Sequence, residues 1–140
     1  MSDVSPLPRY LPPVSRRLPP TESRFAQEVG YEKRLAEAEA KLQEFSDRVP
    51  VILEAGPRST LTVDKRKFLV PGDASVAQFF QTIRKRFKLT PEQGLFLFVD
   101  NLLPPMTHSM SQLYKDHACN DRFLYMQISS ETTFGAVTGV

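Results

Sequence analysis

Residues 65–99, KRKFLVPGDASVAQFFQTIRKRFKLTPEQGLFLFV, decide the fold because they hold a strand, a helix and a second strand in close succession. Five apolar residues recur at helical spacing after a capping residue, Asp73 or Ser75, and predict a helix over 75–87. They are Val76, Phe79, Phe80, Ile83 and Phe87. The unbroken apolar run at 95–99 predicts a central strand that is covered on both faces.

Further strands lie on either side of this stretch. Residues 48–54 and 61–70 read as a hairpin, Pro71-Gly72 ends its second strand, and 121–128 alternate as a last strand after a short helix near 109–114. The order strand, strand, helix, strand, strand is that of a β-grasp domain. We therefore predict an α+β fold with a four-stranded mixed sheet. Its expected core includes Phe79, Phe80, Ile83, Leu97, Val99 and Leu124.

Two more helices are predicted before the sheet. Thr21 or Ser23 can cap a short one, and apolar residues at three- and four-residue spacing extend the second over 31–45. Residues 1–21 hold six of the 12 prolines and several arginines without a periodic apolar pattern, which predicts a disordered extension. The domain is then expected over 22–129, with a flexible tail after it.

Composition narrows the class of protein. No apolar run approaches the roughly 18–20 residues needed to cross a bilayer, and prolines interrupt any signal peptide. The single cysteine, Cys119, fits a reducing compartment, so a cytoplasmic protein is expected. Residues 64–88 carry seven lysines and arginines against two aspartates, which indicates an acidic partner or a solvated face. We expect no nucleic-acid partner.

No catalytic or metal-binding constellation is evident. His108, His117 and Cys119 lack metal-ligand spacing, and a Cys119–His117 nucleophile would lack an orienting group. We expect no metal, no cofactor and no enzymatic activity.

Several strings together carry a family resemblance: YEKRLAEAEAKLQEFSDRVPVILE, DKRKFLVP, VAQFFQTIRKRFKL, LFLFV, LPP, LYKDH, FLY and the late TFG. In this order they resemble the ubiquitin-like modifiers of autophagy, the group that includes the GABA-receptor-associated proteins and the microtubule-associated light chains. The resemblance covers about residues 25–135 and implies a ubiquitin-like β-grasp domain. The Pro/Arg-rich extension lies outside it.

The resemblance implies conjugation to a lipid. Phe134-Gly135 matches the point where such modifiers mature, so residues 136–140 would be a propeptide that a cysteine protease removes between Gly135 and Ala136. Activating and conjugating enzymes would then join Gly135 to phosphatidylethanolamine, whose two acyl chains suffice for stable anchoring. The cytoplasmic precursor would thus move to autophagosome and related vesicle membranes.

The resemblance also implies a peptide-docking groove for cargo receptors with an aromatic-x-x-aliphatic motif, added as a strand beside residues 67–70. The aromatic pocket would use Glu37, Pro50, Ile52, Lys67, Leu69 and Phe123. The aliphatic pocket would use Phe68, Val70, Pro71, Phe79, Ile83 and Thr82. The acidic flank of the motif would meet Arg48, Lys65, Arg66 and Arg86. Without the resemblance, the apolar members could equally be core residues.

Three residues depart from the family pattern around the groove. Lys41 replaces an aliphatic residue at the aromatic pocket, and Ala74 and Thr82 are smaller or more polar than usual near the aliphatic one. These departures affect ligand preference. Two other readings stay open with the same fold: an adaptor that is not conjugated, and a modifier joined to protein lysines.

Overall fold

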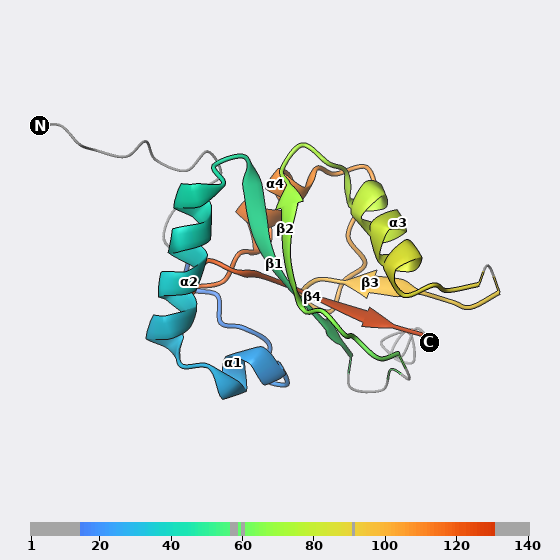
Figure 1. The fold of residues 1–140 in the computed structure, drawn as a ribbon, viewed down its shortest axis with the longest axis horizontal. Helices are drawn as coiled ribbons and strands as arrows, with labels where there is room; N and C mark the ends of the chain where they lie inside the picture. The colour runs from blue at the N-terminus through green and yellow to red at the C-terminus, as the bar shows by residue number, and fades with distance from the viewer. Residues whose placement is uncertain (1–14, 57–58, 60, 91, 131–140) are drawn as a thin grey trace, which may run out of the picture.

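A four-stranded mixed sheet organises the computed structural model, which describes residues 15–56, 59, 61–90 and 92–130 (Figure 1). The strand order is β2-β1-β4-β3. β1 is antiparallel to β2 and parallel to β4, and β3 is antiparallel to β4. The α+β β-grasp prediction is therefore confirmed. The elements are α1 Arg24–Glu28, α2 Tyr31–Glu44, β1 Arg48–Ala55, β2 Lys67–Pro71, α3 Val76–Arg86, β3 Phe96–Phe98, α4 Met110–His117 and β4 Leu124–Ser129.

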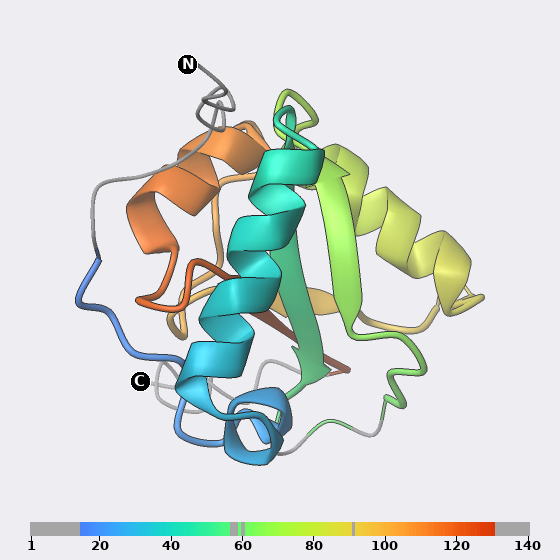
Figure 2. The ribbon, with the colours of Figure 1, turned by 60° about the vertical axis from the view of Figure 1, so that its left-hand side comes forward.

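Helices cover both faces of the sheet, with α1 and α2 on one side and α3 on the other (Figures 1 and 2). Strand alternation divides the core accordingly. In β1, Val51 and Leu53 join the cluster that contains Val76 and Ile83 of α3. Ile52 points the other way, into a cluster with α1 and α2. This second cluster consists of Phe25, Ala38, Ile52, Cys119, Phe123 and Tyr125.

Serine caps begin three of the helices, as their sequences predict. Ser75 caps α3, and its hydroxyl accepts from the Gln78 N–H while the Gln78 side chain accepts from the Ser75 N–H, a complete capping box. Ser23 and Ser109 cap α1 and α4, each by accepting one backbone N–H with its side chain.

The apolar run at 95–99 is not central, and this prediction was wrong. β3 is an edge strand that pairs only with β4 among the described residues, although Leu97, Phe98 and Val99 are all buried. Leu97 and Val99 pack into the α3-side core, whereas Phe98 lines a cleft with Leu18 of the N-terminal segment. The run is apolar on both faces because both faces are covered, which does not require a neighbour on each edge.

One smaller expectation also fails. β2 begins at Lys67 rather than near residue 61, and residues 61–66 run as irregular chain with Leu61 and Val63 partly packed on the core. Phe80 is partly buried and packs against the α3-side core from the margin of the α3 stripe. The other five predicted core residues are buried.

Residues 15–21, expected to be disordered, lie against the domain in this structure. Arg17 forms an ion pair with Asp100 at 2.8 Å, and its carbonyl accepts from the Asn120 N–H at 2.7 Å. These contacts place Arg17, a residue of the predicted extension, against the domain. Among the described residues, no helix has the length and apolar character that a membrane span requires.

Candidate functional site

The free edge of β2 is the structural basis of the predicted docking groove. In the β1–β2 ladder the Leu53 N–H donates to the Arg66 carbonyl, and the Gly72 N–H donates to the Asp47 carbonyl. Because bonded pairs alternate along an antiparallel ladder, Lys67 and Leu69 direct their N–H and C=O groups away from β1. Lys67 and Leu69, on either side of Phe68, are therefore available to pair with an added strand.

The backbone of β1 tolerates proline opposite this edge. Pro50 is the partner of Leu69 in the register, and its missing N–H would have pointed toward β4. Pairing with β4 begins only at Val51. Pro50 thus removes no ladder hydrogen bond while it places a rigid apolar surface beside Leu69.

The predicted aromatic pocket is brought together, but it is closed. Pro50, Ile52, Lys67 and Leu69 share the sheet face that α1 and α2 cover, yet Ile52 and Phe123 are 0% and 3% exposed. An ion pair of 2.8 Å between Lys67 Nζ and Glu37 Oε2 spans the gap from β2 to α2. An incoming aromatic ring would have to displace this pair to reach the floor.

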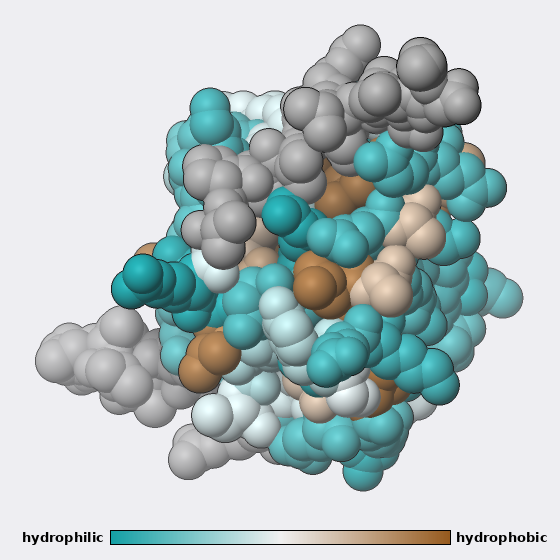
Figure 3. All heavy atoms as spheres, turned by 90° about the vertical axis from the view of Figure 1, so that its left-hand side faces the viewer, coloured by the Kyte–Doolittle hydropathy of each residue, from teal (hydrophilic) through white to brown (hydrophobic). Residues whose placement is uncertain are grey.

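Phe25 of α1 fills the space beneath that ion pair. Its ring meets Phe123 edge-on at 5.4 Å, while Lys67 Nζ and the Arg66 guanidinium lie 5.3 and 5.1 Å from its centroid. Such cation–π contacts add modest stability at partly exposed sites. The same face is mainly hydrophilic, with small and separate apolar patches among the described residues (Figure 3).

The predicted aliphatic pocket is largely core. Val70, Phe79 and Ile83 are buried, and only Phe68 and Pro71 of this group offer surface on β2. The Phe68 ring packs edge-on against Phe79 at 5.7 Å. Thr82 is exposed and donates its hydroxyl hydrogen to the Gln78 carbonyl within α3. Phe68 and Pro71 are thus the β2 residues through which a ligand side chain can touch this half.

Each basic residue of the expected rim has an internal partner. Arg48 donates to the outward carbonyl of Leu69 at 3.4 Å, and Lys65 lies 4.9 Å from the Phe68 centroid. Arg66 pairs with Glu28 at 3.1 Å, and Arg86 pairs with Asp64 at 3.4 Å. Glu28 and Asp64 are exposed, so an acidic ligand can compete with them for Arg66 and Arg86 at small cost.

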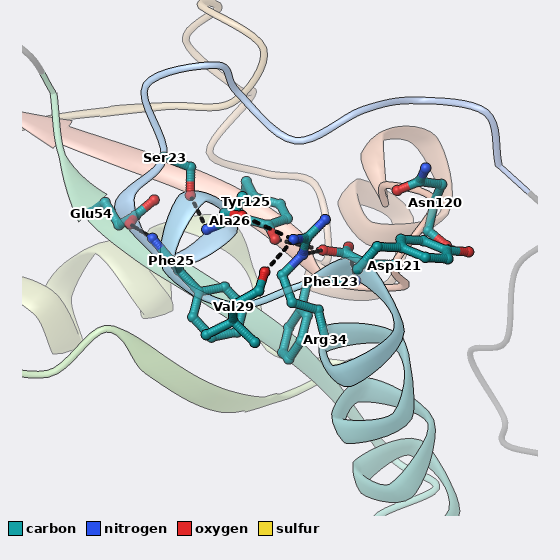
Figure 4. Close-up of polar contacts among 11 residues, drawn as sticks. Ser23, Phe25, Ala26, Val29, Arg34, Glu54, Asn120, Asp121, Phe123 and Tyr125 are labelled. Carbon is teal, nitrogen blue, oxygen red and sulfur yellow. Dashed lines mark hydrogen bonds and ion pairs between the residues drawn. The ribbon is translucent and has the colours of Figure 1, made fainter.

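A buried polar network attaches the N-terminal helices to the sheet (Figure 4). Arg34 Nε meets the Asp121 carboxylate at 2.8 Å, with side-chain exposures of 9% and 0%. The guanidinium also donates to the carbonyls of Ala26 and Val29 at the end of α1. Asp121 accepts in turn from the Tyr125 hydroxyl and the Phe123 N–H. The network fixes α1, and with it Phe25, over the aromatic half of the groove.

Phe25, Arg34 and Asp121 were not among the predicted site residues. The sequence does indicate that Arg34 is buried, because Arg34, Ala38 and Leu42 recur every four residues on the buried face of α2. A charge on an apolar face indicates a buried partner. Nothing in the local pattern identifies Asp121 as that partner, since the pair is separated by 87 positions.

The two neighbouring residues with nucleophilic or metal-ligating side chains, His117 and Cys119, have separate environments. Burial, reinforced by Asp121, raises the pKa of the Cys119 thiol to about 12, so the thiolate is scarce at neutral pH. His117 pairs with Asp100 instead. Within the described ranges, no group of three His, Cys, Asp or Glu residues could hold a metal ion. The predicted maturation site, Phe134, Gly135 and Ala136, lies outside the described residues.

Known proteins are similar to this chain over most of its length. The family model described as "Autophagy protein Atg8 ubiquitin like" matches residues 33–135. Autophagy-related protein 8 of Colletotrichum lindemuthianum and that of Neurospora crassa are each 51% identical over 114 residues, which cover 81% of this chain and 94% of the relative.

Solved structures agree. Trypanosoma brucei ATG8 superposes with a TM-score of 0.74 at 33% identity, covering 78% of this chain and 95% of the other. Plasmodium falciparum Atg8, solved in complex with a Plasmodium falciparum Atg3 peptide, superposes with a TM-score of 0.72 at 32% identity and covers 78% and 97%. The chain therefore belongs to the Atg8 family and is a ubiquitin-like modifier of autophagy.

Proposed function

We propose that this chain is joined through Gly135 to phosphatidylethanolamine and then recruits cargo receptors at the β2 edge. The observation that carries the proposal is the extent of the family match. It ends at residue 135, which is a glycine, and leaves residues 136–140 beyond it. Those five residues would be a propeptide that a cysteine protease removes after Gly135.

The chemistry of the conjugation favours a terminal glycine. Activating and conjugating enzymes must hold the tail in narrow channels, and glycine has no Cβ to obstruct the approach of a thiol or of other backbones. Two acyl chains then give stable membrane residence where one gives only marginal binding. The precursor would be cytoplasmic, and the conjugated form would reside on autophagosome and related vesicle membranes.

The Atg3 peptide bound to the Plasmodium relative supports a similar contact here. We infer that short peptides, including segments of the conjugating enzyme and cargo receptors, add as a strand to β2. The outward N–H and C=O groups of Lys67 and Leu69 would form the hydrogen bonds. The aromatic side chain would part Lys67 from Glu37, both partly exposed, at a cost of about 0–1 kcal/mol.

The specificity of the groove follows from its two halves. The aromatic side chain would settle against Pro50, Leu69 and Phe25, and the aliphatic one would lie on Phe68. Arg48, Lys65, Arg66 and Arg86 would exchange internal partners for the acidic flank of the ligand. A peptide of the form Glu-Asp-Trp-x-x-Leu is expected to bind near −8 kcal/mol, which is micromolar affinity.

Titration of the labelled protein with this peptide by NMR tests the docking proposal. Leu69→Ala should weaken binding by reducing apolar contact, and Arg48→Glu should weaken it by repelling the acidic flank. The second effect should fade as salt rises, because exposed charges are screened beyond about 8–10 Å. Shifts confined to surfaces away from residues 67–70 would refute it.

A further inference from the structure

The N-terminal segment occupies a second surface, at the opposite edge of the sheet from β2. Residues 15–20 run without helix or strand, and a turn at 21–22 leads into α1 (Figure 2, blue). Arg17 anchors the path at three points: its guanidinium meets the Asp100 carboxylate at 2.8 Å and the Asp116 carbonyl at 3.3 Å, and its carbonyl accepts from the Asn120 N–H. Glu22 closes it by accepting from the Gln127 side chain at 2.9 Å.

Between these anchors the segment lies over a cleft of about 260 Å³. Residues 18–22 line one side of the cleft, where Pro19 and Pro20 are partly buried and Leu18 is 71% exposed, so the prolines supply the apolar contact. The other side is formed by five domain residues: Phe98, Asp100, Asn101, Tyr125 and Gln127. Apolar rings beside a carboxylate suit an extended proline-containing peptide that carries an arginine before its prolines.

The sequence of the extension contains this ligand type twice. Arg-x-Leu-Pro-Pro occurs at 9–13 as RYLPP and at 16–20 as RRLPP. The two copies differ at the position of Arg17, where the first copy has Tyr10. The copy that lies on the domain is the one with the cation that pairs with Asp100.

We propose that the surface of Phe98, Asp100, Tyr125 and Gln127 is a second peptide-docking surface, specific for Arg-x-Pro-Pro segments, and that residues 17–20 occupy it as a tethered ligand. A partner carrying such a segment must displace the tethered copy, whose effective concentration is in the millimolar range for a short linker. The extension thus regulates access to this edge of the sheet. The β2 groove is not involved.

The test uses the full chain with Arg17→Glu, which places like charges opposite each other at Asp100. Arg16→Glu is the matched control, because Arg16 is exposed and has no ion pair among the described residues. Faster hydrogen exchange of the Asn120 amide in Arg17→Glu alone should report release of the segment. Two synthetic peptides, VSRRLPPT and LPRYLPPV, are then titrated while the amides of Phe98, Tyr125 and Gln127 are followed by NMR.

The peptide VSRRLPPT is expected to bind Arg17→Glu at least tenfold more tightly than Arg16→Glu, and several-fold more tightly than LPRYLPPV binds the same variant. Asp100→Asn in the Arg17→Glu chain should remove the preference between the peptides. Asparagine tolerates the positive φ of 51° at this turn, so the substitution should not disturb the fold. Equal affinity for both variants, unchanged Asn120 exchange, or no preference for VSRRLPPT would overturn the proposal.

Discussion

Replacement of Arg34 by alanine should cost about 3–5 kcal/mol of unfolding free energy, because it leaves a buried carboxylate without its cation. Asp121 is 0% exposed at its side chain and would keep only the Tyr125 hydroxyl and the Phe123 N–H as donors. The carbonyls of Ala26 and Val29 would also lose a donor. Unsatisfied buried groups of this kind cost about 1–3 kcal/mol each, so the estimate is not an upper limit.

Urea unfolding followed by far-ultraviolet circular dichroism measures this cost. Lys33→Ala, one position away and exposed on the same helix, is the matched control and should change stability by less than about 0.5 kcal/mol. In the Arg34→Ala background, Asp121→Ala should cost less than it does alone, because the pair acts as a unit. A loss below about 1 kcal/mol for Arg34→Ala would refute the role of the network in holding α1 and α2 to the sheet.

Three further predictions concern other parts of the molecule. Cys119, buried and with its pKa raised to about 12, should react with iodoacetamide only as fast as the protein unfolds, and rapid labelling of the folded protein would contradict its placement. Burial and the hydrogen bond to Asp121 raise the pKa of the Tyr125 hydroxyl, so the unfolded chain releases this proton at lower pH than the folded chain. The urea midpoint should therefore fall as pH rises past about 10. Tyr125→Phe should reduce that fall, and the same pH dependence in Tyr125→Phe would show that this hydroxyl does not contribute to it. Lys41→Ile should raise affinity for the Glu-Asp-Trp-x-x-Leu peptide by adding apolar surface beside Glu37, and equal or weaker binding would place Lys41 outside the groove.

The sequence predicted most of the elements because local signals and packing agree in them. Ser75 and the apolar stripe of α3 fix one helix in both cap and buried face. The alternation of Leu124, Met126 and Ile128 with Phe123 and Tyr125 correctly assigns the two faces of β4.

Features that depend on contacts with segments far away in the sequence could not be predicted in the same way. The run at 95–99 reports burial on both faces, but sequence alone does not show that the N-terminal segment, rather than a neighbouring strand, accompanies it. The aromatic half of the groove is closed by Phe25 of α1, and the ion pair between Arg34 and Asp121 holds α1 in place. Only a three-dimensional arrangement relates those three residues.

The mass of the C-terminal peptide recovered from cells tests whether this Atg8-family chain is anchored to membranes through Gly135. We expect two species, one ending in a free Gly135 carboxylate and one carrying phosphatidylethanolamine on Gly135, with residues 136–140 absent from both. Gly135→Ala should abolish both species and the recovery of the protein with membranes. A C-terminal peptide that still ends at Val140, a glycine joined to a protein lysine, or normal membrane recovery of Gly135→Ala would show that Gly135 is not the anchor.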